Sequence, residues 1–294
     1  MRITNQMMFN QAQSQAAAAR DRASQAQDQV ATGIRVVHPG DDPAAAGLMV
    51  SQKIAIQRYE VIDQSISRAT GELQTADGAL QGVTTLLARA QQLAVQLGND
   101  TYGNTERQAG AQEINSISAQ IGQLMNTQVA GRYIFGGNVD NAPPFDAAGN
   151  YSGDTTVRQV EVAPGLRQDA SVRGDDVVKG TAGGVDIFAV LKSLATALTN
   201  NDGSSIRATV DGMSQSTGQV AAALTKTGAM MSSFDSAKQI GTVAKDSTQK
   251  VLAAGSEVDI FEAATQLAQA QNALQAALAA TARSFDTSLL NFLK

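Results

Sequence analysis

Apolar residues recur at intervals of three and four along most of this 294-residue chain, which is the pattern of helices that pack lengthwise against one another. The longest run extends from Leu48 to Leu97, and Gln52 is its one polar member. Asp42 suits the N-cap of this helix and Pro43 its first helical position. We therefore predict a single helix over residues 43–97, about 80 Å long at ~1.5 Å per residue.

The composition agrees with long helices and argues against one compact globular core. The chain has 50 Ala, no Cys and no Trp, and only 4% of its residues are aromatic. Alanine favours helix but buries little surface, so the core must be spread along extended helix pairs. Similar spacing predicts further helices over 9–30, from about 105 to 131, from 186 to 198, from 206 onward and from 260 to 292.

Residues 138–185 break the helical spacing, because Gly and Pro alternate there with segments such as 156–162 that read as short strands. We predict a mainly α fold: a long antiparallel helical rod, or coiled-coil bundle, of N- and C-terminal segments with a small β-rich inserted domain. The expected parts are an N-terminal assembly helix and loop (1–40), the two halves of the rod (41–137 and 186–255), the inserted outer domain (138–185) and a C-terminal assembly helix (256–294).

The sequence offers no catalytic, cofactor or metal site. A single histidine, His38, lies near Asp41 and Asp42, but an Asp-Pro pair at a helix start is better explained by capping than by metal or acid–base chemistry. No activated nucleophile or phosphate-binding glycine loop is found. The net charge of −5 without a basic stripe argues against nucleic acid, and no apolar run reaches the ~20 residues that cross a bilayer. The N-terminus does not read as a cleaved signal peptide.

The first and last helices have weak apolar seams. The seam of the first consists almost entirely of alanine, and a buried alanine methyl contributes about 0.8 kcal/mol against about 1.5–3 kcal/mol for Leu or Ile. Such a seam hardly offsets the conformational entropy that ordering costs. Two interpretations stay open on this ground: residues up to about 32 and beyond about 260 are mobile in the monomer and become ordered against neighbouring subunits, or they cap the bundle of their own chain.

The order of several motifs resembles the bacterial flagellin superfamily along essentially the whole chain. The motifs are the polar start followed by an Ala-rich heptad, Thr-Gly-Ile-Arg at 32–35, Asp-Asp-Pro-Ala at 41–44, Gly-Arg-Tyr-Ile-Phe-Gly-Gly at 131–137, Glu-Val-Asp at 257–259 and the ending Ser-Leu-Leu-Asn-Phe-Leu at 288–293. Within the superfamily, the start, the 131–137 segment, the modest insertion and the ending are most similar to the hook–filament junction proteins, hook-associated protein 3.

This resemblance implies a structural, non-enzymatic role outside the cell. Such proteins leave unfolded through the flagellar type III export channel, form a ring with copies of themselves, and join hook-associated protein 1 to flagellin; an export chaperone is a further expected partner. The resemblance favours ordering on assembly, and it implies a subunit interface made of Phe9, Ala12, Ala16, Ala19, Ala23, Ala26, Val30, Ile260, Ala264, Leu267, Leu274, Leu278, Phe285, Leu289 and Phe292.

Two functions other than that of a junction protein are compatible with part of the sequence. Filament flagellin is the alternative within the same superfamily, and self-polymerisation into long filaments would favour it. A helical adhesin or signalling coiled coil fits the composition but not the Asp-Asp-Pro segment or the terminal pattern. Loss of the gene should separate the three.

Overall fold

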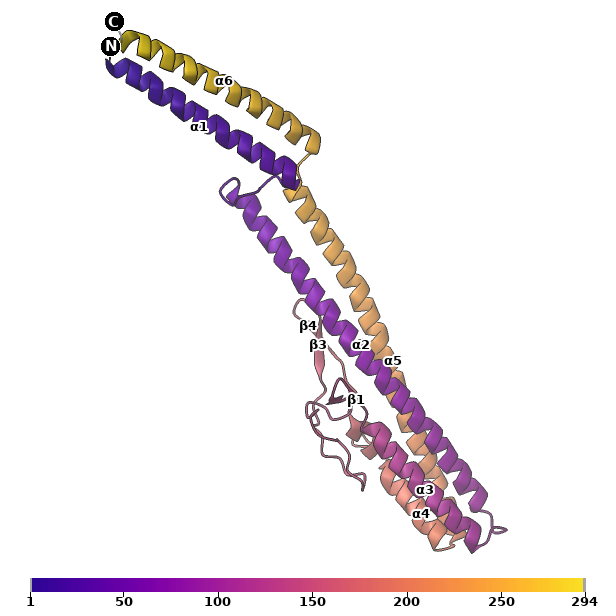
Figure 1. The fold of residues 1–294 in the computed structure, drawn as a ribbon. Coiled ribbons are helices and arrows are strands. Elements are labelled where there is room, and N and C mark those ends of the chain that lie inside the picture. The colour runs from indigo at the N-terminus through magenta and orange to yellow at the C-terminus, as the bar shows by residue number, and fades with distance from the viewer. Residues whose placement is uncertain (1, 293–294) are drawn as a thin grey trace. The chain divides into compact units, whose positions relative to one another are not determined.

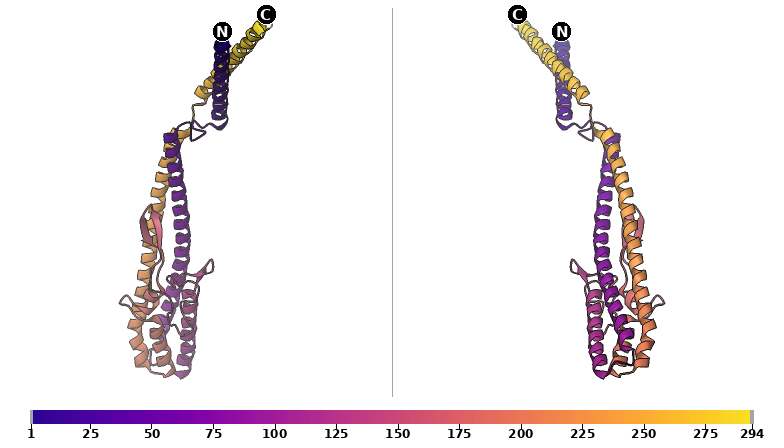
Figure 2. Two further views of the ribbon diagram at one scale, coloured as in Figure 1. Left: turned by 90° about the vertical axis from the view of Figure 1, so that its left-hand side faces the viewer. Right: turned by 90° about the vertical axis from the view of Figure 1, so that its right-hand side faces the viewer.

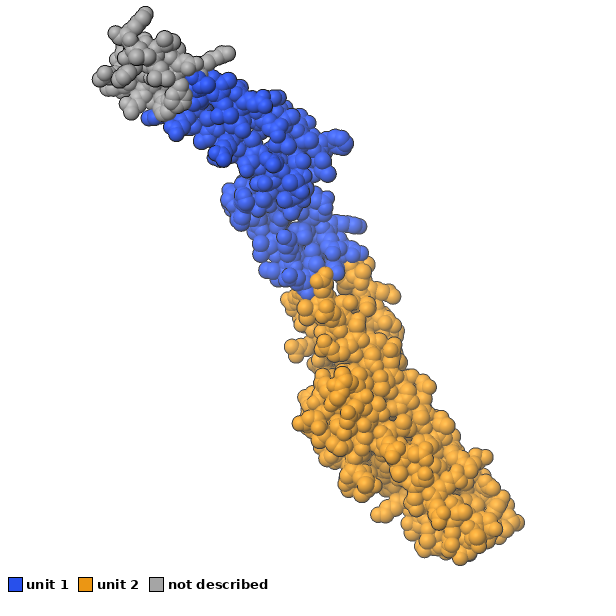
Figure 3. Space-filling model, viewed as in Figure 1, with its two compact units in different colours: residues 1–57, 244–294 blue, residues 58–243 orange. Residues whose placement is uncertain are grey.

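The computed structural model describes the backbone of residues 2–292 and the side chains of Met7 and of residues 10–282. It divides into two compact units, residues 1–57 with 244–294 (unit 1) and residues 58–243 (unit 2) (Figure 3). The helices are α1 (Arg2–Thr32), α2 (Pro43–Leu97), α3 (Asn104–Met125), α4 (Ile187–Thr199), α5 (Gly203–Ser256) and α6 (Ile260–Phe292). The predicted mainly α fold of long helices with small antiparallel sheets is confirmed.

In unit 1, α1 packs against α6, so the first helix pairs with the last (Figures 1 and 2). In unit 2, α2 and α5 run antiparallel. Lys238 Nζ lies 3.4 Å from a carboxylate oxygen of Asp63, and Arg207 donates to the carbonyl oxygen of Gly98 at 2.6 Å. Helices α3 and α4 pack against each other beside this pair (Figure 2).

The core of unit 2 follows the spacing predicted from the sequence. Every core position of α2 from Ile62 to Leu97 is buried, and α5 contributes Ile206, Met213, Val220 and Phe234. These side chains lie on one stripe of each helix because residues three and four apart share a face. A stripe of large aliphatic residues buried over this length explains why unit 2 needs no disulfide.

The third helix is shorter than predicted, since α3 ends at Met125 rather than near Gly131. The side chain of Asn126 donates to the carbonyl oxygen of Phe145 and accepts from the amide of the same residue, at 2.8 and 3.0 Å. The chain then forms a tight hairpin of β1 (Gln128–Val129) and β2 (Arg132–Tyr133), with Ala130 and Gly131 at positive φ. Positive φ at both central residues suits the twist of a two-residue hairpin loop.

Residues 138–185, the predicted insertion, consist of irregular chain, a short π-helical turn (Asp175–Lys179) and one longer hairpin, β3 (Gln159–Ala163) with β4 (Leu166–Asp169). This hairpin contacts α2 and α5 of unit 2 through polar side chains. Arg158 forms an ion pair with the buried carboxylate of Glu72 on α2. The side chain of Gln168 accepts a hydrogen bond from Ser233 of α5 at 2.8 Å.

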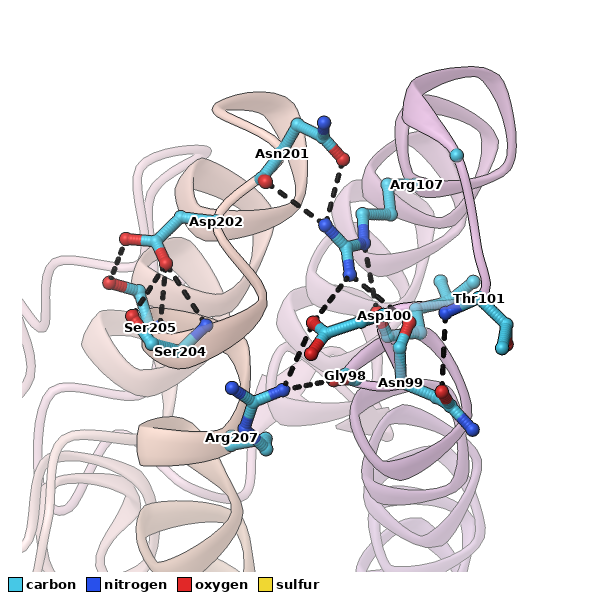
Figure 4. A network of polar contacts seen from close by, with 12 residues as sticks. Gly98, Asn99, Asp100, Thr101, Arg107, Asn201, Asp202, Ser204, Ser205 and Arg207 are labelled. Carbon is cyan, nitrogen blue, oxygen red and sulfur yellow. Dashed lines mark hydrogen bonds and ion pairs between the residues drawn. The ribbon is translucent and has the colours of Figure 1, made fainter.

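One end of unit 2 is closed by a polar network around Arg107 (Figure 4). Arg107 is buried, with 4% of the residue exposed. Its side chain donates to the carbonyl oxygens of Leu97 and Asn99, at 3.0 and 3.1 Å, and to Asn201. Asp202 caps α5 by accepting from the amides of the two serines that follow Gly203. The loops that follow α2 and α4 are thereby joined.

Candidate assembly interface

The alanine seam of α1 is covered by the chain's own last helix. Ala19, Ala23 and Ala26 are buried, while Ala12, Ala16 and Val30 are half-buried. These positions lie on the α1 face that the heptad spacing picked out, and α1 contacts α6. Small side chains let two helix backbones approach closely, so alanine suits this seam.

On α6 the covered seam is displaced from the predicted one. The buried and half-buried positions are 263, 267, 270, 274, 277 and 281, which include the predicted Leu267 and Leu274. Ala263 is fully buried although heptad counting did not select it. The predicted residues Ile260, Ala264 and Leu278 are exposed. The side chains of Phe9, Phe285, Leu289 and Phe292 lie outside the described residues. The assignment of these sets to a subunit interface stays a prediction.

The exposed surface of the terminal helix pair lacks charge over long stretches. Residues 263–282 of α6 and 3–19 of α1 contain no Asp, Glu, Lys or Arg. After Glu262 in the first turn, the outward positions described on α6 are alanine, glutamine, Thr265, Asn272 and Leu278. Leu278 is 54% exposed, and Ile260 and Phe261 at the start of the helix are 63% and 87% exposed. A helix face that stays in water ordinarily carries charged side chains. Counting the distance between charges along the sequence would have revealed this surface; heptad counting did not.

Two connecting segments meet at the end of the terminal pair, where α1 leads to α2 and α5 leads to α6 (Figure 1). They form a short antiparallel bridge centred on Ile34 and Glu257. The amide of Arg35 donates to the carbonyl oxygen of Ser256 at 2.7 Å, and the amide of Val258 donates to that of Gly33 at 3.0 Å. We call residues 33–42 and 255–259 the joint.

The joint also holds the N-caps of two helices. Asp42 Oδ1 accepts from the amide of Ala45 at 3.0 Å, and Pro43 is the first residue of α2. Asp259 Oδ1 accepts from the amide of Phe261 at 2.9 Å at the start of α6. The hydrogen bond from the Ala45 amide, together with the neighbouring Arg35 guanidinium, lowers the pKa of Asp42 below its ordinary value. The carboxylate is therefore ionised at neutral pH.

The neighbourhood of His38 has the geometry of a loop rather than of a metal or acid–base centre. Asp41 accepts from the backbone amide of His38 at 2.9 Å, while Asp42 caps α2. Among the side chains that the structure describes, those of Met7 and residues 10–282, no three or more His, Cys, Asp or Glu gather as metal ligands would. Across the same described part of the chain, none of the helices has the length and apolar character to span a bilayer.

The N-terminal half of the chain matches a known family. Residues 3–140 match the bacterial flagellin N-terminal helical region. The matched segment contains α1, the first half of the joint, α2, α3 and the first hairpin. The superfamily resemblance seen in the motifs is thus confirmed for this part.

Relatives and a solved structure extend the likeness beyond that segment. Flagellar hook-associated protein 3 of Salmonella typhimurium is 34% identical over 162 residues, 54% of this chain and 51% of that protein. The protein of the same name from Escherichia coli is 29% identical over 211 residues, 67% of each. The chain thus spans about half of the first relative and about two thirds of the second. The structure of a putative flagellar hook-associated protein from Vibrio parahaemolyticus superposes with a TM-score of 0.65 over 73% of this chain and 99% of that one, at 19% identity, and shows the same fold.

Proposed function

Because this chain carries the N-terminal helical region of bacterial flagellins and resembles flagellar hook-associated protein 3, we propose that it is a structural component of the bacterial flagellum. More specifically, it forms an adaptor ring that joins the hook, through hook-associated protein 1, to the flagellin filament. Its partners are copies of itself, hook-associated protein 1 and flagellin. It acts by binding these proteins and catalyses no reaction.

The single observation that supports this role best is the long uncharged stretch of the outer face of α6. Ile260, Phe261 and Leu278 are exposed on a helix that has no charged residue from 263 to 282. An extended exposed surface without charge that carries apolar side chains is typical of a place where another protein binds. Because α6 already packs on α1 through a different seam, the outward residues are available to a neighbouring subunit.

The weak inner seam supports the same proposal. Three buried alanines on α1 contribute far less than the Leu, Ile and Val side chains that α2 buries in unit 2. A pair held this loosely is marginal alone and gains most of its order from neighbours. The same property suits passage through a narrow flagellar export channel, which we propose as the route to the cell exterior, with an export chaperone and without a cleaved signal peptide.

Filament flagellin is the alternative, because the matching family model is that of the flagellins themselves. The two roles differ in copy number and in self-assembly. A filament protein polymerises by itself into long fibres, whereas an adaptor stops at a ring. Purified protein that forms filaments without any partner would therefore favour flagellin.

Deletion of the gene tests the proposal directly. Loss of an adaptor leaves hooks intact while flagellin appears unpolymerised in the medium. Loss of filament with no flagellin in the medium would indicate flagellin itself, and normal motility would exclude both roles. Electron microscopy of the cells and immunoblots of the culture medium distinguish the outcomes, with the plasmid-borne wild-type gene as control.

A further inference from the structure

We propose that Arg35 is a positioning residue for assembly, which holds together the ends of α1, α2 and α5 and the segment leading into α6. This inference rests on the proposed function, since it concerns how the terminal pair is presented to neighbouring subunits. In this proposal Arg35 itself contacts no neighbouring subunit. It holds in place the ends of the helices that do contact one.

Arg35 is in contact with three helix ends at once. Its backbone amide donates to Ser256, the last residue of α5, and its carbonyl oxygen accepts from the side chain of Gln29 on α1 at 2.7 Å. Both Nη atoms of its guanidinium lie 3.3 Å from Oδ2 of Asp42, the N-cap of α2. Nη2 also lies 3.5 Å from the carbonyl oxygen of Gly255.

The two carboxylate oxygens of Asp42 accept hydrogen bonds from different groups. Oδ1 caps α2 through the Ala45 amide, and Oδ2 receives Arg35. The guanidinium therefore couples the start of α2 to the last turn of α5 through one shared side chain. The guanidinium spreads several N–H donors over a rigid plane, which suits simultaneous contact with a carboxylate and a carbonyl; an ammonium is a compact point charge and holds this geometry less well.

Without the guanidinium, the polar contacts between the two connecting segments are few, although Val36 is buried in the joint and α1 packs on α6. The connecting segments share two backbone hydrogen bonds, and a pairing this short is marginal by itself. The caps made by Asp42 and Asp259 are local to their own helices and do not need Arg35. Loss of the Arg35 side chain should thus loosen the joint while every helix remains capped.

The Arg35–Asp42 contact should contribute little to the free energy of unfolding. A defect in assembly can therefore be told apart from a defect in folding. Arg35 and Asp42 have side chains 47% and 36% exposed, and exposed ion pairs contribute little to the free energy of unfolding. Unit 2 should unfold at the same denaturant concentration in wild type and in Arg35→Ala. Amide exchange at residues 33–35 and 255–258 should accelerate by about threefold or more.

The test uses purified full-length protein added to hook-bearing cells of the deletion strain, so that export plays no part. The variants are Arg35→Ala, Arg35→Lys and Asp42→Asn, with Asp41→Asn as matched control. Asparagine still caps a helix but lacks the charge, so Asp42→Asn removes only the ion pair. We expect several-fold fewer filaments with Arg35→Ala, an intermediate number with Arg35→Lys and Asp42→Asn, and the wild-type number with Asp41→Asn.

A disulfide across the joint provides the decisive rescue. Ile34 and Glu257 are directly opposed with hydrogen bonds on either side, the close, non-hydrogen-bonded type of antiparallel pair, whose Cα separation suits a disulfide. The chain has no native cysteine. Ile34→Cys with Glu257→Cys, introduced into Arg35→Ala, should restore filament growth when oxidised and lose it again when reduced.

Each outcome decides the matter. If wild-type protein fails to restore filaments, the proposed function is wrong. If wild type succeeds and Arg35→Ala equals it, the positioning role is wrong. If Arg35→Ala fails and the oxidised disulfide does not rescue it, Arg35 acts otherwise than by holding the joint, and the inference is overturned.

Discussion

Nη1 of Arg107 lies 2.8 Å from the side-chain oxygen of Asn201, although the two residues are 94 positions apart in the chain (Figure 4). The same nitrogen also donates to the carbonyl oxygen of Asn201 at 3.0 Å, and Asn201 adopts a positive φ of 55°. A buried guanidinium thus binds the loop before α5 to the end of α2. Its cationic charge is favourable there because the C-terminal carbonyls of α2 carry partial negative charge.

Replacing Arg107 should destabilise unit 2 substantially. Arg107→Met leaves the carbonyl oxygens of Leu97, Asn99 and Asn201 without their donor, and buried unsatisfied groups cost ~1–3 kcal/mol each where water cannot replace the donor. We expect a loss of about 3 kcal/mol in urea unfolding. Arg207→Met is the matched control, because Arg207 is exposed, and it should cost less than about 1 kcal/mol. Equal losses in the two variants would contradict the assigned role.

The buried ion pair between Glu72 and Arg158 should hold the long hairpin in place. Glu72→Ala leaves Arg158 partly buried and unpaired, and we expect a loss of about 3 kcal/mol with faster amide exchange over 159–169. Replacing both residues by leucine should recover most of this loss. The exposed pair of Arg58 with Glu161 is the control, and Arg58→Ala should change stability by less than ~1 kcal/mol.

Acidification should weaken the start of α5 through Asp202. Hydrogen bonds from the side chain of Ser205 first, and also from Ser204, lower the pKa of Asp202 below its ordinary value. A lowered folded-state pKa contributes stability above the unfolded pKa of about 4, and this is lost as the pH falls further toward the folded pKa. Asp202→Asn keeps a cap but does not titrate. The difference in Tm between wild type and Asp202→Asn should therefore shrink between pH 6 and pH 3, whereas a constant difference would contradict the prediction.

The terminal pair should exchange its amides much faster than unit 2 in the isolated monomer. The seam of α1 buries alanines, whereas α2 in unit 2 buries large aliphatic side chains, so local opening of α1 and α6 requires less free energy. Hydrogen exchange with mass spectrometry measures this directly, with α2 residues 62–97 as internal reference. Full protection of both terminal helices in the monomer would show that they need no neighbours to become ordered.

A charge on the outer face of α6 should abolish assembly without unfolding the monomer. Leu278 is 54% exposed, so Leu278→Lys should change the free energy of unfolding by no more than about 0.5 kcal/mol. In an assembled ring the same lysine would be buried without a partner, which is costly. Counts of filaments grown on hooks after addition of purified protein measure the effect, with Lys192→Glu on α4 as the control charge change. Assembly by Leu278→Lys at the wild-type level would exclude this face as an interface.

The sequence alone determined that the chain forms long helices and where the buried stripe of α2 lies. The run from Leu48 to Leu97 places α2 correctly because the spacing of apolar residues and the Asp42–Pro43 start are local features. The end of α3 was predicted too late. That helix ends where Asn126 binds the backbone of Phe145, a contact that no local spacing reveals.

Only the tertiary structure decided which α6 residues face α1, and it alone identified Arg35 and Arg107 as residues that join distant segments. Heptad counting selected Ala264 where Ala263 is buried, because alanine dominates α6 and offers no contrast between neighbouring positions. The acceptors of Arg35 and Arg107 include backbone carbonyls such as those of Gly255 and Leu97. Every residue carries the same carbonyl group, so a sequence leaves no mark of which one a distant arginine will reach.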